Sequence, residues 1–400
     1  MEEKKLVPKM VFKEFKSTSL WKMYKLGQLI DYQHNGQTPS RFNELYWNGS
    51  INWLTSGELN RKRVYETMEK ITEAGKLNAN LKLIPKGTFI MAITGLEAVG
   101  TRGNCAMLGI DTTLNQSCMA IIPDRKHLDS QFLFYWYCKV GEKYGLQYTQ
   151  GTKQQSYNAE LIKVLPITIP EIEEQQKIGE FFKVLDERIT NQERKIAKVK
   201  DLKSAYLTEM FPQEGETVPK RRFKGFVDEW NETTLDNVLA YEQPTDYIVD
   251  EDSYDDSYDI PVLTAGQSFI LGYTNEKHGI KKADVDNSVI IFDDFTTSSH
   301  HVDFFFKVKS SALKILSSNS RKFTTYFAYL ILNNIDYIPE SHERHWISIF
   351  SNFEVMIPSM EEQQKIGEFF KNLDNQIEME EKKLDKLQKM KEAYLEEMFV

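Results

Sequence analysis

Hydrophobic residues recur at alternating intervals of four and three positions in two long segments, at 170–211 and 358–399. This spacing, sustained over about three heptads, predicts the buried seam of a coiled coil. Charged residues fill most other positions, so each segment is expected to be a long helix with one apolar stripe that is unstable alone. Pairing of the two helices is the simplest way to bury both stripes. The predicted seam residues are Ile178, Phe182, Leu185, Ile189, Ile196, Val199, Ile366, Phe370, Leu373, Ile377, Leu384 and Leu387.

The two predicted helices are copies of one sequence. The stretch EEQQKIGEFFK stands at 173–183 and again at 361–371, and the similarity continues at the same offset to the ends of both helices. Ser359 followed by Glu362 fits a capping box at the start of the second helix. An identity of this length does not arise by chance, so both copies are expected to serve the same purpose.

A second repeat indicates that the chain is organised as a cycle. VPKMVFKEF at 7–15 resembles VPKRRFKGF at 218–226, which follows the first helix directly, whereas the matching copy stands at the start of the chain. A pseudo-two-fold axis accounts for this order if the helices are antiparallel and the chain begins near the end of the second helix. The blocks 31–165 and 240–357 show no comparable similarity to each other. Two equal frames therefore hold two different inserts.

Both inserts are expected to mix strands with short helices. The runs GTFIMAITG and VIIFDDFTT are typical of strands, and SQFLFYWYCKV is typical of a helix. The predicted fold class is α+β, with two mixed α/β domains separated by two long antiparallel helices that form a coiled coil, in a pseudo-two-fold cyclic repeat. The predicted bounds are 1–168 for the first domain, 169–211 for the first helix, 212–356 for the second domain and 357–400 for the second helix.

Composition narrows the class of protein. A chain of 400 residues with 41% apolar content can bury a sizeable core. No apolar run approaches the roughly 18 residues of a membrane span, and the charged start MEEKK is not that of a secretory signal. Three cysteines without metal-ligand spacing are typical of a reduced, cytoplasmic protein.

The net charge of −9 argues at first against a nucleic-acid partner, but it is unevenly distributed. Residues 1–170 carry +7 and residues 212–357 carry −11, whereas the two helix segments are close to neutral or mildly acidic. The average therefore hides a basic first part and an acidic third part.

Signatures of catalysis are absent. The chain has no GxxxxGK[ST] loop, no GxGxxG after a predicted strand, no GxSxG and no Asn-Pro-Pro-aromatic tetrad. His342 and His345 lie three residues apart, whereas a zinc-binding HExxH motif needs a spacing of four, so a polar loop is favoured over a metal site. We therefore expect no catalytic residues and no metal site.

Polar residues in predicted loops are candidates for DNA contacts instead. Arg and Gln suit bidentate recognition of guanine and adenine, whereas Lys, Ser and Thr suit phosphate oxygens. For any one of these residues a solvated surface role is the commoner one, and only their clustering in the basic segment makes DNA binding competitive. The candidates in the first block are Arg41, Thr55, Arg61, Arg63, Thr101, Arg102, Lys153, Gln154 and Gln155. Those in the second block are Thr264, Gln267, Ser268, Thr296, Thr297, His300, Arg344 and His345.

The acidic run TDYIVDEDSYDDSYD at 245–259 does not fit this interpretation. It cannot lie against phosphates without a large electrostatic cost. It would face away from DNA as a solvated loop, or face a basic protein partner.

The alternation of variable block and repeated Pro-x-x-x-Glu-Gln helix ending in Met-Phe resembles the specificity subunit of type I restriction-modification systems. The resemblance covers the whole chain and is most specific over 169–211, 357–399 and the two VPK segments. It implies that each variable block is a target-recognition domain for one half of an asymmetric bipartite site in double-stranded DNA, and that the helix pair sets the spacing between the halves.

The resemblance also implies a division of labour among subunits. Two methylation subunits, which carry S-adenosylmethionine, would dock around the helix pair, and restriction subunits would add translocation driven by ATP and Mg together with cleavage. This chain would bind no cofactor itself. Outward-pointing residues that repeat in both helices fit such docking: Glu173, Gln176, Lys177, Glu180, Glu361, Gln364, Lys365 and Glu368.

Two alternatives remain open on the residues alone. One is a coiled-coil adaptor whose end domains bind proteins rather than DNA. The other is an enzyme whose site has no recognised motif. The cyclic frame with unlike inserts favours the DNA-specificity interpretation, since an adaptor has no need of it.

Overall fold

Two compact units make up the chain, and each contains one variable block together with parts of both long helices. Unit 1 is Met1–Arg194 with Lys382–Val400, and unit 2 is Lys195–Glu381. The computed structural model describes residues 6–17, 20–97, 100–151, 155–265, 269–338 and 345–400.

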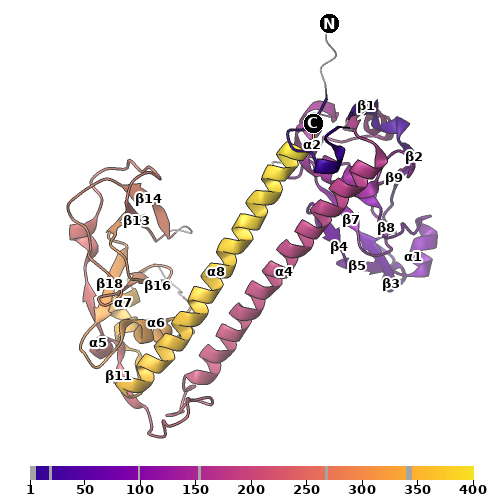
Figure 1. Cartoon of the computed structure of the whole chain (residues 1–400). Helices are drawn as coiled ribbons and strands as arrows, with labels where there is room; N and C mark the ends of the chain where they lie inside the picture. The colour runs from indigo at the N-terminus through magenta and orange to yellow at the C-terminus, as the bar shows by residue number, and fades with distance from the viewer. Residues whose placement is uncertain (1–5, 18–19, 98–99, 152–154, 266–268, 339–344) are drawn as a thin grey trace. The chain divides into compact units, whose positions relative to one another are not determined.

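The two long helices are α4 (Ile172–Met210) and α8 (Met360–Met398), each of 39 residues (Figure 1). In unit 1 the Phe181 ring contacts Tyr394 at 5.1 Å, and in unit 2 the Tyr206 ring contacts Phe369 at 5.0 Å. In both units α4 and α8 run antiparallel. The two contacts are equivalent, because Phe181 and Phe369 occupy the same position in the two copies of the repeat, as do Tyr206 and Tyr394. The predicted α+β fold with an antiparallel helix pair is confirmed.

Most predicted seam residues are buried. Ile178, Phe182, Leu185, Ile189, Ile196, Val199, Ile366, Phe370 and Leu373 are buried, and Ile377, Leu384 and Leu387 are half-buried. Two helices alone cover only one narrow strip of each other, which leaves the edges of that strip open to solvent.

The first turns of each long helix bury their apolar residues against a variable block as well as against the other helix. Phe182 packs at 5.0 Å from Tyr135 of the first block and 5.8 Å from Phe399 at the end of α8. In unit 2 Phe370 lies 6.2 Å from Phe211 at the end of α4, and Phe211 stacks on Phe327 of the second block at 5.5 Å. The predicted apolar stripe therefore packs against both the other long helix and the variable block, because a phenylalanine side chain is large enough to contact both.

The first block is built on a five-stranded sheet of order β2-β9-β6-β7-β4 and a three-stranded sheet of order β5-β3-β8. Helix α2 packs on the larger sheet, with Phe132–Tyr137 in the main core of unit 1. The strands are β2 (Ile30–Asn35), β3 (Trp47–Leu54), β4 (Lys62–Val64), β5 (Glu69–Ile71), β6 (Phe89–Ala92), β7 (Cys105–Leu108), β8 (Thr113–Leu114) and β9 (Cys118–Pro123). The helices are α1 (Glu73–Asn78), α2 (Ser130–Tyr148) and α3 (Ala159–Lys163).

The second block has the same topology, despite the lack of sequence similarity. Its sheets have the orders β12-β18-β15-β16 and β14-β13-β17, so among the described residues each sheet strand of the first block except β4 has a counterpart. In each block the middle strand of the small sheet has one antiparallel and one parallel neighbour. The strands are β12 (Leu239–Glu242), β13 (Ile260–Leu263), β14 (Ile270–Thr274), β15 (Val289–Asp293), β16 (Ser299–Val302), β17 (Lys307–Val308) and β18 (Leu313–Ser318). The helices are α5 (Leu235–Val238), α6 (Thr325–Asn334) and α7 (His345–Ser348).

A two-stranded ribbon joins each block to its frame. Strand β1 (Lys22–Lys25) pairs with β10 (Pro166–Ile169) in unit 1, and β11 (Asn231–Thr234) pairs with β19 (Glu354–Ile357) in unit 2. A buried tryptophan precedes each ribbon, Trp21 or Trp230, and contacts the phenylalanine at the end of a long helix. These tryptophans, which follow the two VPK segments in the sequence, therefore tie each ribbon to the end of a long helix.

A buried glutamine in each copy of EEQQKIGEFFK binds the start of the block's main helix. Gln175 accepts a hydrogen bond from the N–H of Asp129, the N-cap residue of α2, at 3.0 Å and donates to the His127 carbonyl at 2.9 Å. Gln363 makes the matching bonds in unit 2, with the N–H of Thr324 (3.2 Å) and the Lys322 carbonyl (3.1 Å). An amide offers a donor and an acceptor together, which a charged side chain cannot do.

Glu362 has a partner that the sequence did not indicate. The Ser359 hydroxyl accepts from the Glu362 N–H at 3.4 Å, as a capping box requires. The Glu362 carboxylate, however, is buried and forms a two-pronged ion pair with Arg222 of the VPK segment, with both distances 2.7 Å.

The other elements of the described residues are short 3-10 helices: η1 (Lys13–Phe15), η2 (Leu26–Gln28), η3 (Glu44–Tyr46), η4 (Ser56–Glu58), η5 (Pro244–Tyr247) and η6 (Phe350–Asn352).

In the part of the chain that the structure describes, none of the helices combines the length and the apolar character that a membrane span needs.

The cyclic order predicts that new chain ends are tolerated. The Met10 N–H donates to the Glu397 carbonyl at 2.9 Å, so the first VPK segment lies beside the end of α8 within unit 1. A variant with Val400 linked to Met1 and a cut between Gly215 and Glu216 should keep a free energy of unfolding within about 1 kcal/mol of the parent, since loop closure costs depend weakly on length. Circular dichroism with urea titration measures this, and loss of cooperative unfolding would contradict the cyclic model.

The repeated glycines Gly179 and Gly367 provide a matched pair. A Cβ on Gly179 would lie 2.9 Å from the Cβ of Gln131, whereas one on Gly367 would have its nearest neighbour, Tyr326, at 3.6 Å. Gly367→Ala should raise the free energy of unfolding of unit 2 by about 0.5–1 kcal/mol through helix propensity. Gly179→Ala should lower that of unit 1 by about 1 kcal/mol, because overpacking exceeds the same gain. Hydrogen exchange in α6 and α2 separates the two units, and equal shifts for both variants would refute the difference.

Candidate DNA-binding surface

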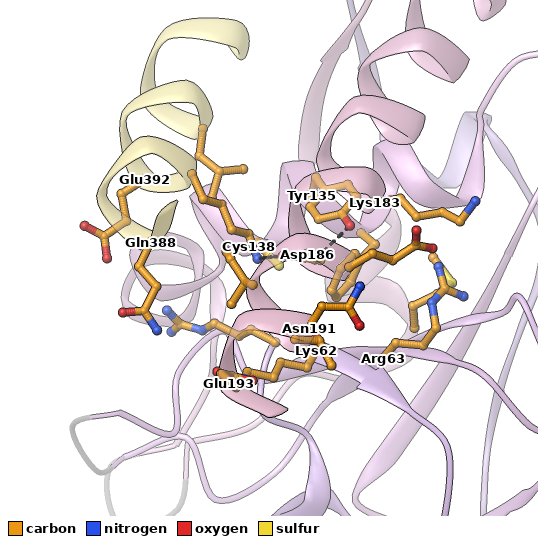
Figure 2. Close-up of a pocket in the computed structure, with 18 of the residues that line it drawn as sticks. Lys62, Arg63, Tyr135, Cys138, Lys183, Asp186, Asn191, Glu193, Gln388 and Glu392 are labelled. Atoms are coloured by element: carbon orange, nitrogen blue, oxygen red, sulfur yellow. Dashed lines mark hydrogen bonds and ion pairs between the residues drawn. The ribbon is translucent and has the colours of Figure 1, made fainter. Parts of the chain in front are cut away.

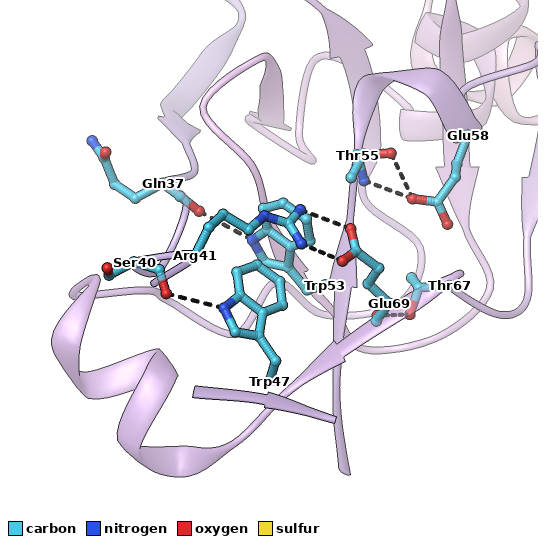
Figure 3. A network of polar contacts seen from close by, with 9 residues as sticks. All are labelled: Gln37, Ser40, Arg41, Trp47, Trp53, Thr55, Glu58, Thr67 and Glu69. Carbon is cyan, nitrogen blue, oxygen red and sulfur yellow. Dashed lines mark hydrogen bonds and ion pairs between the residues drawn. The ribbon is translucent and has the colours of Figure 1, made fainter. Parts of the chain in front are cut away.

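Arg41 stands on a tryptophan-lined edge of the first block, beside β3 and β5. Its guanidinium lies 3.8 Å from the centre of the Trp47 ring and 5.1 Å from that of Trp53, and both its terminal nitrogens donate to the Glu69 carboxylate (Figure 3). The two indole N–H groups donate to the Ser40 and Gln37 carbonyls, which locks the rings in place. Arg41 is thus exposed but held in one orientation.

The Glu69 pairing changes what Arg41 can do. The hydrogen bonds from Arg41 lower the pKa of Glu69, so the carboxylate stays charged and competes with any other acceptor for the guanidinium. Phe42, Leu45 and Met68 are strongly exposed apolar side chains on the same loops. This edge combines a fixed cation with apolar surface, a composition suited to stacking and to base edges.

A second cluster brings three predicted residues together. Arg61 donates to the Arg102 carbonyl at 2.8 Å, and the Arg102 Nε donates to the Gln155 side chain at 3.3 Å. Arg102 also donates to the Glu97 carbonyl at 2.8 Å, and its loop packs on Gly145 of α2. The three side chains are half-buried, and part of their hydrogen-bonding capacity holds the loop itself.

Arg63 lines a groove of about 1110 Å³ between the first block and the segments of α4 and α8 that belong to unit 1, and Arg61 lines the same groove (Figure 2). Arg63 donates to Gln131 of α2 at 3.1 Å. Its neighbour Lys62 pairs with Glu193 at 2.9 Å, and Lys391 pairs with Asp186 at 2.6 Å. A phosphate in this groove would have to break such pairs, so the groove is a salt-bridged seam rather than an open basic channel.

In the second block, the turn between β15 and β16 presents Thr296 and Thr297. Buried Asp293 accepts from the Phe295 N–H at 2.9 Å and from the Thr296 hydroxyl at 2.5 Å. Thr297 has φ +60°, a left-handed conformation that costs a β-branched residue on the order of 1–3 kcal/mol. The turn is therefore rigid and strained, and it carries two hydroxyl groups at the surface.

The residues next to this turn explain why it is rigid. Asp294 is buried, accepts from the Trp346 N–H at 2.9 Å and lies 3.5 Å from the buried Lys314 ammonium. The His345 ring bonds to the Asp294 carbonyl at 2.8 Å and is fully buried. His345 thus supports the turn from inside the fold, where it cannot reach a base. Exposed His300 stacks on Phe269 with ring centres 3.9 Å apart.

The other predicted DNA contacts have mixed settings. Thr55 is half-buried and caps a 3-10 turn by binding Glu58, with its hydroxyl at 2.8 Å. Thr101 and Thr264 are half-buried. Lys153, Gln154, Gln267, Ser268 and Arg344 lie outside the described residues, as does His342 of the disfavoured metal pair.

The acidic run at 245–259 is partly tied to the second block. Asp252 pairs with Lys309, and Asp250 with His278 at 2.9 Å. Asp250, Glu276 and His278 are close enough to share a metal ion. Glu276, however, already accepts from the N–H groups of Asp250 and Glu251 and pairs with buried Lys307. Its carboxylate is engaged in holding the loop.

The eight predicted docking residues all lie on exposed faces of the long helices. In the first copy Lys177 pairs with Glu14 at 3.3 Å, and Glu180 pairs with Lys183 at 3.0 Å. Such exposed pairs contribute little to stability, so they do not by themselves explain why these positions repeat.

Sequence reasoning missed the polar residues that the frame buries. Gln175 and Gln363 are almost fully buried, and Asp186 and Asp374 each bind a tyrosine of the block. These residues are identical in the two copies of the repeat although they lie outside the apolar stripe, and this identity could have indicated a shared structural role. The docking hypothesis drew attention instead to the exposed positions of the same repeat.

A family model described as the type I restriction modification DNA specificity domain matches residues 18–201 and 227–389. The chain belongs to this family. The two matches cover both blocks and most of both long helices, in line with the duplicated architecture.

Individual relatives support the same family. The chain is 47% identical over 134 residues to the specificity subunit of the type I restriction enzyme EcoR124I/EcoR124II from Escherichia coli, an alignment covering 33% of each protein. It is 28% identical over 191 residues to the MjaIX specificity subunit of Methanocaldococcus jannaschii, covering 45% of this chain and 43% of that protein. These alignments span less than half the length of the two relatives.

The fold is similar to that of solved structures. The S subunit of a type I restriction-modification system from M. genitalium superposes with a TM-score of 0.70 over 99% of both chains, at 16% identity. A chain from a study of complex assembly and conformational transition of the type I R-M system gives a TM-score of 0.50 at 14% identity, over 95% of this chain and 97% of that one. At these identities the likeness concerns the fold.

Unit 2 should lose stability in mild acid through His301. Burial against α6 lowers the pKa of His301 to about 4, with Lys371 adding to this and Asp303 and Asp374 opposing it. Because the folded pKa lies below the ordinary 6.5, the unfolded state takes up the proton first, and stability present above pH 6.5 is lost as the pH falls toward 4. The loss is up to about 3 kcal/mol, reduced by the solvent that reaches the half-buried ring.

His301→Phe should remove this contribution while keeping the edge-on contact with Tyr326. The free energy of unfolding of both proteins, measured by denaturant titration between pH 4.5 and 7.5, should therefore diverge as the pH falls, with the variant losing less. Parallel pH profiles would show that His301 is not responsible.

Proposed function

We propose that the chain is the DNA sequence-specificity subunit of a type I restriction-modification complex. Each recognition domain would read one half of an asymmetric bipartite site in double-stranded DNA. The observation that carries this proposal is that one duplicated frame holds two blocks of the same topology but unlike sequence. Two identical readers would require a palindrome, whereas two different readers require an asymmetric site. The domains would be 1–168 and 212–356, joined by the helices at 169–211 and 357–400.

Several surfaces of the blocks are suited to contact DNA. The Arg41 edge offers a guanidinium on an indole platform, and exchange of Glu69 for a guanine edge would release it for bidentate recognition. The Thr296–Thr297 turn presents two hydroxyl oxygens, whose protons are bound to Asp293 and to the Thr296 carbonyl, so these oxygens would accept hydrogen bonds from base amino groups. The Arg61, Arg102 and Gln155 cluster supplies the remaining candidates of the first block. The acidic run 245–259 would face away from the phosphates.

The helix pair would set the spacing between the two half-sites and receive two methylation subunits. The exposed repeated residues of α4 and α8 support this role, because two partners related by a pseudo-two-fold axis would need the same surface twice. Restriction subunits would complete the complex. S-adenosylmethionine, ATP and Mg would be bound by those partners and not by this chain, which would act as a non-catalytic subunit in the cytoplasm.

The test is co-expression of this chain with the methylation subunit of its own restriction-modification system, followed by mapping of methylated adenines on genomic DNA. The expected result is one bipartite motif with two defined halves at a constant spacing. Methylation without sequence preference, or none at all in an assembled complex, would contradict the proposal. Such a result would favour the alternative of an adaptor whose end domains bind proteins.

Exchange of one block separates the roles of the parts. Replacing residues 240–357 by the corresponding block of another family member should change one half-site and leave the other half-site and the spacing unaltered. The control is the same exchange with the parent block reinserted through identical junctions. A change in both halves would rule out the assignment of one block to one half.

A further inference from the structure

One three-residue contact occurs twice in the molecule. In unit 1 the Tyr135 hydroxyl donates to Asp186 at 2.8 Å, and Lys391 pairs with the other oxygen of the same carboxylate at 2.6 Å (Figure 2). Asp186 belongs to α4, Lys391 to α8 and Tyr135 to helix α2 of the first block. The contact therefore joins both long helices to the recognition domain.

Unit 2 contains the same contact with the long helices exchanged. The Tyr326 hydroxyl of α6 donates to Asp374 at 2.5 Å, and Lys203 pairs with Asp374 at 2.5 Å. Asp186 with Asp374, and Lys203 with Lys391, are equivalent positions of the repeat. We call each set of three residues a clamp.

The chemistry favours a stiff connection. Burial and the adjacent carboxylate raise the pKa of both tyrosines, so each phenol keeps its proton and donates it. A hydroxyl that donates to a carboxylate is among the stronger hydrogen bonds in proteins. The ion pair with lysine keeps that carboxylate charged and fixes its orientation. In both ion pairs, each side chain is at most about one third exposed.

The tyrosines come from different turns of their helices. Tyr135 is six residues after the N-cap Asp129, whereas Tyr326 is two residues after the N-cap Thr324. Four residues are about one helical turn, so both positions face the same side. Two blocks of unlike sequence thus reach equivalent aspartates, Asp186 and Asp374, from different helix positions, which indicates that the contact matters more than the position.

The clamp is one of several attachments of each recognition helix to the long helices, and in unit 1 Lys139 of α2 also donates to the Phe399 carbonyl at 2.9 Å. Another is the glutamine bridge at its N-cap, made by Gln175 or Gln363. A single attachment at one end would let the helix pivot, and each further attachment along the helix restricts its direction. A swing of the helix shifts each loop of the block in proportion to the distance of that loop from the bridge, and successive base pairs along a DNA strand are only about 3.4 Å apart.

We propose that the two clamps fix the angle of each recognition domain on the helix pair and thereby restrict the spacer length that the complex accepts. This proposal rests on the proposed function. Tyr135 and Tyr326 are then positioning residues, which touch no base. The lever arm is about 9 Å from N-cap to Tyr135 and about 3 Å to Tyr326, so the clamp of unit 1 contributes more to the angle.

The test compares Tyr135→Phe and Tyr326→Phe with the matched control Tyr144→Phe. Tyr144 also lies on α2 and also loses one hydrogen bond, to the Pro166 carbonyl at 2.7 Å, but it does not touch either long helix through that bond. Complexes with the methylation subunit act on a library in which both half-sites are constant and the spacer varies by one base pair at a time. Methylation at each spacer and thermal stability are both measured.

Tyr135→Phe should raise methylation at spacers one base pair longer or shorter by about tenfold relative to the preferred spacer, as expected for the loss of one charge-assisted hydrogen bond. Tyr326→Phe should have a smaller effect, and neither should change the bases read. Tyr144→Phe should lower stability alone. Unchanged spacer preference in Tyr135→Phe, with stability reduced as in the control, would overturn the proposal.

A measurement without DNA separates the clamp from the proposed function. Spin labels at Lys86 in the first block and Arg188 on α4, in a Cys138→Ser background, report the distance distribution within unit 1. Tyr135→Phe should broaden it and Tyr144→Phe should not, whereas equal widths would refute the clamp. If the wild-type complex methylates no bipartite site, the proposed function and the spacer proposal both fail, and the distance distributions still decide whether the clamp holds the domain.

Discussion

A buried amide at the start of each long helix is the contact on which the rest of the structure depends. Gln175 and Gln363 each bind an N-cap N–H and a nearby carbonyl of the recognition helix of their unit, and each also donates to the proline carbonyl that precedes its own helix. These groups would otherwise be buried without partners, which is costly inside a protein. The bridge therefore fixes where the block meets the frame.

The same constraint explains the identity of the two copies of EEQQKIGEFFK. Within eleven residues the motif supplies the amide bridge and phenylalanines that pack on the block and on the other long helix. Because the long helices are antiparallel, each unit contains the start of one copy and the end of the other. Every frame contact must therefore work twice, which leaves little freedom for either copy to diverge.

The blocks show the opposite relationship between sequence and structure. Their strand orders agree apart from β4, yet their sequences share no comparable similarity. A sheet topology requires only alternating buried positions and suitable turns, which many sequences satisfy. The exposed loops are then free to differ, as in the tryptophan-lined Arg41 edge of one block and the strained Thr297 turn of the other.

The sequence by itself determined the long helices, the cyclic frame and the family, because heptad spacing and internal identity are properties that can be read along the chain. It also identified candidate DNA-binding residues by type. Only the tertiary structure decided which of them are available: His345 is buried, and Arg41 is engaged by a carboxylate 28 residues away. It likewise decided that Tyr135 meets Asp186 across 51 residues. Such pairings carry no periodic signal, since they arise where separate elements are brought together by packing.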